Sequence, residues 1–112
     1  EMVKYLINTF LSVKVSFANE IYQICDGLKI DYDKVVEYAT YDERLGDSHW
    51  NVPGHDGDFG FGGHCFPKDL SALIHLSDNL ETTSNVLTAT RDTNDSVRKN
   101  RDWEGMKGRA VS

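Results

Sequence analysis

The fold is decided by residues 1–28, which read EMVKYLINTFLSVKVSFANEIYQICDGL. Apolar side chains recur here in steps of three and four, the period of one face of an α-helix, and predict a helix over residues 1–26. This apolar stripe comprises Val3, Ile7, Phe10, Phe17, Ile21, Ile24 and Leu28. Further apolar residues lie on other faces, so we expect the helix to be buried on more than one side, with one side against another subunit or domain. Gly27 is expected to end the helix in the left-handed conformation that glycine adopts without strain.

Three further helices are expected along the chain. Asp31 is placed to cap a second helix, because an aspartate there accepts hydrogen bonds from free backbone N–H groups. The residues of this helix expected to face the core are Val35, Val36 and Ala39. Pro67 stands where a third helix should begin, since proline at the first helical position loses no hydrogen bond. A polar fourth helix should run from near Thr83 to Asn100. Its few apolar anchors are Val86, Leu87 and Val97.

Residues 45–66 separate the second and third helices as a long loop that contains six glycines. Structureless loops longer than about 12–15 residues are uncommon in compact domains and are usually functional or disordered. Aromatic side chains such as Trp50 and Phe59 argue against a disordered linker. The sequence therefore predicts a mainly α fold with a long first helix and a long glycine-rich active-site loop.

Composition narrows the class of protein. A chain of 112 residues suffices for one domain with one modest core. The formal net charge is −6 and the basic residues are scattered, which argues against nucleic acid as a partner. The apolar runs are too short to cross a membrane. Two cysteines are too few for a disulfide framework, which favours a reducing, cytoplasmic location.

The two ends suggest a piece of a longer polypeptide. The chain starts with Glu1, and the helical pattern is already running at Val3 with no capping residue before it. Residues 107–111 look like a turn that leads into a strand with no length left to form. We therefore expect a helical domain over residues 1–101 and the truncated start of another domain over residues 102–112.

Cys65 is the residue best suited to chemistry. It stands just before the expected third helix, whose N-terminus presents partial positive charge and free N–H groups. Both favour the thiolate, and Lys68 adds a positive charge within one turn. The preceding glycines let backbone approach a ligand closely, and Asp69 could hold a water molecule. The group suits attack by sulfur on a carbonyl carbon. The alternative is that Cys65 is a small buried side chain with no chemical role.

Two other patterns bear on chemistry. Lys4 and Asn8 lie four residues apart, so they project from one face of the first helix and could donate hydrogen bonds to an oxyanion. Alternatively, both simply face solvent. No metal site is expected, because the histidine spacing matches no standard zinc pattern and adjacent residues such as His64 and Cys65 rarely bind one tetrahedral ion. The glycines do not form a dinucleotide fingerprint, since no strand precedes them.

Residues 60–69, which read GFGGHCFPKD, closely resemble the active-site cysteine motif of the UDP-glucose 6-dehydrogenase family. Residues 4–20, which read KYLINTFLSVKVSFANE, resemble that family's central helix, and residues 44–46 resemble its arginine-containing turn. The resemblance covers nearly the whole chain in order. It implies an enzyme of three parts: an N-terminal Rossmann-like domain for NAD, a helical central domain that pairs subunits and carries the cysteine, and a C-terminal Rossmann-like domain for UDP. This chain resembles the central part, so a homodimer through the long first helix is expected.

The resemblance also implies a reaction, in which the C6 alcohol of UDP-glucose is oxidised to a carboxylate in two NAD-dependent steps. Cys65 would attack the C6 aldehyde, and the thiohemiacetal would give hydride to NAD and leave a thioester that water hydrolyses. The resemblance implies that Lys4 and Asn8 stabilise the oxyanion and that Asp69 handles the proton and the water. Arg44 would contact the substrate of the partner subunit, and Lys68 would lie near the nicotinamide cofactor. The residues implied to contact the substrate are Phe59, Gly60, Phe61 and Gly62. NAD would be bound mainly by the missing N-terminal domain, so the chain alone is expected to be inactive.

Several alternatives remain open. Close relatives oxidise GDP-mannose or N-acetylated UDP sugars, although the Phe-Pro-Lys-Asp sequence at residues 66–69 favours UDP-glucose. The loop from Asp47 to Phe59 is longer than in many members, so its substrate contacts cannot be carried over. From a different class, the chain could be a helical dimerisation module with a vestigial site. A cysteine hydrolase is a third alternative, but no histidine is clearly placed as its base.

Overall fold

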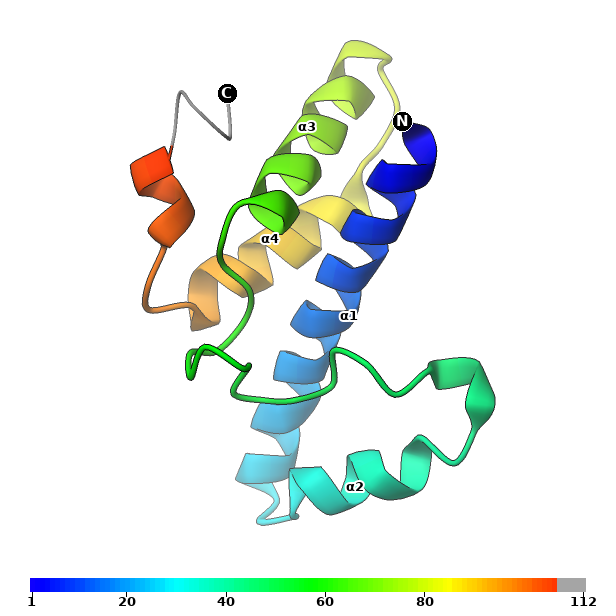
Figure 1. The fold of residues 1–112 in the computed structure, drawn as a ribbon, viewed down its shortest axis with the longest axis vertical. Coiled ribbons are helices and arrows are strands. Elements are labelled where there is room, and N and C mark those ends of the chain that lie inside the picture. The colour runs from blue at the N-terminus through cyan, green and yellow to red at the C-terminus, as the bar shows by residue number, and fades with distance from the viewer. Residues whose placement is uncertain (107–112) are drawn as a thin grey trace.

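The computed structural model describes residues 1–106, and within that range the chain is mainly helical (Figure 1). Its elements are α1 (Met2–Gly27), α2 (Tyr32–Ala39), the 3-10 turn η1 (Glu43–Leu45), α3 (Cys65–Asn79), α4 (Asn85–Val97) and the 3-10 turn η2 (Asp102–Met106). Both α3 and α4 pack against α1, and α2 lies at the C-terminal end of α1 (Figure 1). The predicted mainly α fold is confirmed. The strand expected near residues 107–111 lies outside the described residues.

The long helix α1 turns small side chains inward and large apolar ones outward. Ser12, Ser16 and Ala18 are buried against the other helices, and Ser16 Oγ donates a hydrogen bond to the Thr90 carbonyl of α4 at 2.9 Å. Short side chains at a helix contact allow the two helix axes to approach closely. The predicted apolar stripe faces outward instead, with Ile21 alone partly buried in the core. Its other members are 50–72 % exposed: Val3, Ile7, Phe10, Phe17, Ile24 and Leu28.

The interior consists of two small apolar clusters. One lies at the C-terminal half of α1, where Ala18, Cys25, Tyr32 and Val52 are buried together. The other lies between α1, α3 and α4 and is built on Phe61, Leu70 and Ile74. Each cluster includes a residue of the long loop, Val52 in the first and Phe61 in the second. The loop is therefore part of the core. Among the described residues, no helix is both long enough and apolar enough to cross a membrane.

One of two predictions about helix ends needs correction. Helix α1 does end at Gly27, but the residue with positive φ is Lys29 (φ 61°), because the chain stays right-handed through Leu28 before it reverses. Ile30 N then donates to the Cys25 carbonyl at 2.8 Å. Asp31 caps α2 as predicted, accepting hydrogen bonds from Asp33 N and Lys34 N.

Predictions about the packing faces of the shorter helices were partly wrong. Val35 and Ala39 are exposed, and only Val36 packs on the first cluster, because α2 touches the rest of the domain along one edge. Val86 is 65 % exposed, because α4 is anchored by the buried polar residues Thr90 and Asn94. Helix α4 ends at Val97, three residues before the predicted end.

Candidate active site around Cys65

Cys65 is the first residue of α3 and is exposed, while the other cysteine, Cys25, is buried. The predicted helix start at Pro67 was two residues late, because His64 occupies the capping position. Proline fits the third helical position because N–H groups of the first turn have no partner within the helix. The first helical hydrogen bond runs from Lys68 N to the His64 carbonyl at 3.3 Å. Cys65 thus lies at the positively polarised N-terminal end of α3.

A cavity of about 620 Å³ opens beside Cys65. The cysteine shares its wall with Gly60, Phe61 and Gly62, three of the four residues that the sequence assigned to substrate contact. The fourth, Phe59, packs in the first apolar cluster instead. Cavities of about 300–1,000 Å³ are typical of small-molecule sites. The glycine-rich loop therefore lines a cavity of the size typical of small-molecule sites, with Cys65 on its wall.

The earlier part of the loop also lines this cavity. His49 and His55 line it, and the His49 ring lies 5.8 Å from the Phe66 ring. Burial, followed by the charge of nearby Lys14, lowers the pKa of His49, so its imidazole is uncharged at neutral pH. No cluster of three or more His, Cys, Asp or Glu side chains within residues 1–106 could hold a metal ion.

The backbone of the loop is held by two buried asparagines. Asn94 of α4 accepts a hydrogen bond from Phe61 N at 2.7 Å and donates one to the Phe61 carbonyl at 3.0 Å. Asn19 of α1 accepts a hydrogen bond from Gly60 N at 3.1 Å. Gly60 has φ +69°, and a Cβ there would collide with Asn94 Oδ1. The two side-chain amides thus make the hydrogen bonds to the loop backbone that neighbouring strands would make in a sheet.

Arg98 fixes the next part of the loop. Its guanidinium is 1 % exposed and lies 2.8 Å from Asp56, 3.5 Å from Asp58 and 3.7 Å from Asp102. The same group donates to the Asn100 carbonyl at 2.6 Å and to the Phe59 carbonyl at 3.4 Å. One buried cation therefore ties the loop before Cys65 to the chain that follows α4.

Asp69 gathers the remaining residues assigned to chemistry. It is 1 % exposed, and its Oδ2 accepts a hydrogen bond from Asn8 Nδ2 at 2.6 Å. Its Oδ1 lies 3.5 Å from Lys68 Nζ and has no hydrogen-bond partner among the described residues. The Asp69 charge raises the pKa of Lys68, with smaller contributions from the Lys4 side chain and from Cys65. Asn8 of α1 is thus brought to the first turn of α3. Lys4 is exposed, and together with Asn8 it lines a pocket that does not include Cys65.

Arg44 is placed apart from this group. Its side chain is 88 % exposed and is held by Asp42, with Nη2 2.6 Å from Asp42 Oδ2. The turn that carries Arg44 is anchored to α1, because Lys14 Nζ donates a hydrogen bond to the Leu45 carbonyl at 2.9 Å. Lys14 also lies 5.0 Å from the centre of the Trp50 ring. Arg44 therefore points away from its own domain on a fixed turn.

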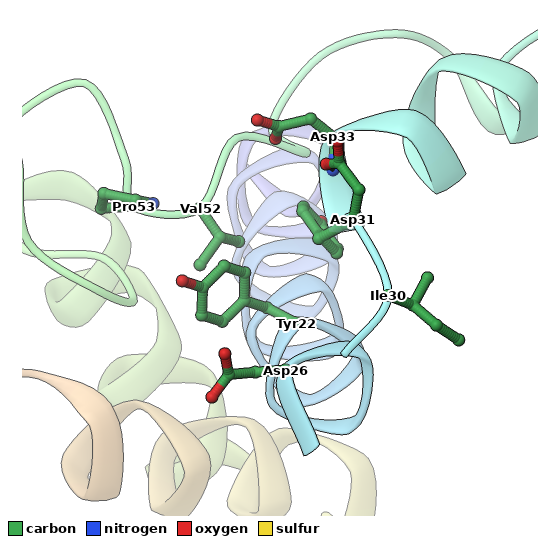
Figure 2. A pocket seen from close by; sticks show the side chains of 8 residues that line it. Tyr22, Asp26, Ile30, Asp31, Asp33, Val52 and Pro53 are labelled. Atoms are coloured by element: carbon green, nitrogen blue, oxygen red, sulfur yellow. Dashed lines mark hydrogen bonds between the residues drawn. The ribbon is translucent and has the colours of Figure 1, made fainter. Parts of the chain in front are cut away.

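A second cavity, of about 360 Å³, lies at the far end of α1 (Figure 2). Tyr22 and Val52 point into it, and Asp26, Asp31 and Asp33 stand around its rim (Figure 2). It shares no lining residue with the cavity beside Cys65. The second cavity is therefore separate from the one beside Cys65.

The UDP-glucose/GDP-mannose dehydrogenase family, central domain, matches residues 1–96. The chain belongs to this family. The resemblance recognised in residues 60–69 is thereby confirmed.

Curated members of the family match over much of this chain. UDP-glucose 6-dehydrogenase TuaD of Bacillus subtilis is 36 % identical over 98 residues, which is 88 % of this chain and 20 % of the relative. UDP-glucose 6-dehydrogenase YwqF of the same organism is 42 % identical over 81 residues, 72 % of this chain and 17 % of the relative. A solved UDP-glucose dehydrogenase from the hyperthermophilic archaeon Pyrobaculum islandicum has a TM-score of 0.77 at 35 % identity and covers 85 % of this chain and 21 % of that one. The chain thus spans about a fifth of the length of these family members.

Sequence reasoning missed the residues that hold this family's cysteine loop in place here. Asn94 and Arg98 appeared only as part of a polar helix, and Lys14 as part of the first helix. One signal could have revealed them, because a helix with few apolar anchors must be attached by buried polar groups or not at all. The partners of those groups lie 31 to 42 residues away along the chain. The residue pattern along one helix does not reveal these distant partners.

Proposed function

We propose that this chain is the catalytic-cysteine domain of a dehydrogenase that oxidises the C6 alcohol of UDP-glucose to a carboxylate in two NAD-dependent steps. The observation that carries the proposal is the exposed Cys65 at the start of α3, on the wall of a 620 Å³ cavity. The printed names of the relatives support the choice of UDP-glucose. In this proposal residues 1–101 are the central domain, residues 102–112 begin a UDP-binding domain, and the enzyme is cytoplasmic.

The first chemical role belongs to Cys65. Its thiolate attacks the carbonyl carbon of the C6 aldehyde, a C–S bond forms, and the carbonyl oxygen becomes an oxyanion that takes up a proton. Asn8 and Lys4 stabilise that oxyanion. The Asn8 amide has two N–H donors, one of which is engaged by Asp69, so the second stays available.

Asp69 serves the hydrolysis of the thioester. Water attacks the acyl carbon, the C–S bond breaks, and the thiolate is released together with a carboxylic acid. The unpartnered Oδ1 of Asp69 can orient that water and accept its proton, while Oδ2 is fixed by Asn8. Gly60, Phe61 and Gly62 line the sugar, with Phe59 behind them in the core.

NAD supplies the hydride acceptor for both oxidations when it is bound. Within this chain, Lys68 is the residue proposed to approach it. The Lys68 side chain fits that place, because it is 26 % exposed while the buried Asp69 fixes its ammonium group on the other side. The rest of the cofactor site is assigned to the part of the enzyme that precedes this domain.

Substitution of Cys65 in the full-length enzyme tests this proposal. We expect Cys65→Ser to lower NADH formation from UDP-glucose by about a thousandfold or more, because the nucleophile is lost. Cys25→Ser is the matched control, since Cys25 is buried away from the cavity, and it should keep most of the activity. Unchanged activity of Cys65→Ser would exclude the cysteine mechanism. A clear preference for GDP-mannose or for an N-acetylated UDP sugar would instead change only the substrate.

The outer face of α1 supports pairing of two subunits. Val3, Phe10, Phe17 and Ile24 are spaced seven residues apart and are 53–72 % exposed, the pattern of a helix that packs on another helix. In the proposed homodimer Arg44 reaches the partner's substrate from its exposed turn. This face also suits a dimerisation module whose chemistry is lost, and the Cys65→Ser assay distinguishes the two functions.

Sedimentation of the 112-residue chain tests the pairing. We expect a dimer that Phe10→Asp converts to a monomer, because a charge cannot be buried unpaired in an apolar contact. The polar-to-acidic control Gln23→Asp, at an exposed position of the same helix, should leave the dimer intact. A wild-type chain that sediments as a monomer at high concentration would contradict the proposal.

A further inference from the structure

The guanidinium of Arg98 is more deeply buried than the carboxylates that surround it. It is 1 % exposed, whereas Asp58, Asp102 and Asp56 are 15, 36 and 42 % exposed. A buried cation with this many acceptors fixes geometry, because the planar fork directs each N–H along its own line. Every acceptor lies either in the loop before Cys65 or in the four residues after Arg98.

The same guanidinium explains the glycine at position 62. A Cβ there would collide with Arg98 Nη2 and would lie 2.6 Å from Asp102 Oδ1. Gly62 lacks the positive φ seen at Gly60 and Gly63, so its backbone would accept alanine. What the position requires is room for the ion pair.

Asp102 completes the connection to the cysteine. Its two carboxylate oxygens accept from Gly63 N at 2.9 and 3.1 Å, two residues before Cys65. Asp58 works from the loop side, since its Oδ2 accepts from Asn100 N at 2.7 Å and from Lys99 N at 3.2 Å. The loop and the segment after α4 thus exchange hydrogen bonds in both directions around Arg98.

We propose that Arg98 is a positioning residue, which holds the backbone of residues 60–63 against the end of α4 and so sets the place of Cys65 on the cavity wall. Arg98 acts through Asp102 and the Gly63 amide, and it touches no reacting atom. The expected effect of Arg98 on catalysis rests on the function proposed above, whereas its expected effect on the loop does not.

Amide hydrogen exchange of the 112-residue chain tests the structural part. In Arg98→Met we expect the Gly63 amide to exchange about tenfold faster, while amides in the middle of α1 keep their rates. Arg91→Met is the matched control, because Arg91 lies on α4, two turns before Arg98, and is 44 % exposed. Within the part of the chain that the structure describes, its one ion pair is with Asp92 at 3.9 Å. A uniform rise over α1 and the loop would show a general stability role and overturn the proposal, as would an unchanged Gly63.

Two further measurements keep the proposal falsifiable if Arg98→Met does not fold. Asp102→Ala removes the acceptor of the Gly63 amide at a partly exposed position, and it should speed exchange at Gly63 alone. Gly62→Ala should lower the midpoint of urea unfolding in the wild-type chain but much less in an Arg98→Ala background, where the clash is relieved. Gly27→Ala, where a Cβ meets nothing within 4 Å, should behave the same in both backgrounds. Equal losses for Gly62→Ala in both backgrounds would contradict the contact.

The full-length enzyme gives the catalytic readout. Arg98→Met should lower kcat with UDP-glucose about tenfold while the KM for NAD stays unchanged, because the thiol is misplaced and the cofactor site is not. Faster exchange at Gly63 with an unchanged kcat would overturn the effect on Cys65. An enzyme that does not oxidise UDP-glucose at all would instead refute the proposed function, and the exchange result would stand.

Discussion

The two halves of the long loop are attached to the domain by different means. Residues 45–52 have a side-chain anchor, the contact between Lys14 Nζ and the Trp50 ring at 5.0 Å. In addition, their Leu45 and Trp50 carbonyls accept hydrogen bonds from Lys14 and Tyr32. Residues 58–63 are held through their backbone, by Asn19, Asn94 and the Arg98 cluster. Anchoring through the backbone suits Gly60, Gly62 and Gly63, which have no side chain to pack and which line the cavity beside Cys65.

The strongest test of this contrast is Asn94→Ala. It removes both hydrogen bonds to Phe61 and leaves a buried N–H and a buried carbonyl without partners, so we expect a loss of about 2–4 kcal/mol in the free energy of unfolding. Urea denaturation of the 112-residue chain measures it. Asn85→Ala, at an exposed position in the first turn of α4, is the control. Equal effects of the two substitutions would mean that the backbone anchor contributes little.

A smaller loss is expected from Lys14→Met, which breaks the side-chain anchor. The bond to the Leu45 carbonyl and the cation–π contact with Trp50 disappear while the apolar stem is kept, for about 1–2 kcal/mol. Lys34→Met on the exposed part of α2 should be neutral in the same denaturation experiment. The comparison fails if Lys14→Met also disturbs amide exchange at Phe61, since the two halves would then not be held independently.

The smallest effect at neutral pH belongs to Tyr32, whose hydroxyl donates to the Trp50 carbonyl at 2.6 Å. Tyr32→Phe should cost about 1 kcal/mol. Burial raises the pKa of Tyr32 from 10.0 to about 12. Because the pKa is higher in the folded chain, this contribution to stability is complete below pH 10 and is lost as the pH rises to about 12.

Unfolding measured between pH 8 and about pH 12 therefore separates Tyr32 from the other groups that titrate there. The wild-type chain should lose more stability over this interval than Tyr32→Phe does. Parallel curves for the two proteins would show that the hydroxyl titrates as it does in the unfolded chain, and that this anchor is open to water.

Much of this arrangement could be predicted from the sequence. The features that could not be predicted depend on contacts between residues that are distant in the chain. The period of α1, the cap at Asp31 and the motif around Cys65 are local features, so the residues that carry them are neighbours in the chain. The outward direction of the apolar stripe depends on what α3 and α4 pack against. These helices pack on the side of α1 that carries Ser12 and Ser16, because short side chains allow close helix contact.

The candidate site divides in the same way. Cys65, Asn8 and Asp69 could be named from the motif, and the structure brings Asn8 to Asp69. Phe59 could not be placed, because an irregular loop has no period, and only the fold shows which of its residues meet the cavity. Asn94 and Arg98 lie 33 and 42 residues from their loop partners, a distance at which no periodicity reports on contact.

The burial of Asp69 has a consequence for how the domain can evolve. A carboxylate that is 1 % exposed is costly to bury unless it is paired, and here Asn8 Nδ2 lies 2.6 Å from Oδ2 and Lys68 Nζ lies 3.5 Å from Oδ1. An apolar residue at position 69 would leave the Asn8 amide and the Lys68 ammonium without this partner. Positions 8, 68 and 69 are therefore expected to change together rather than one at a time.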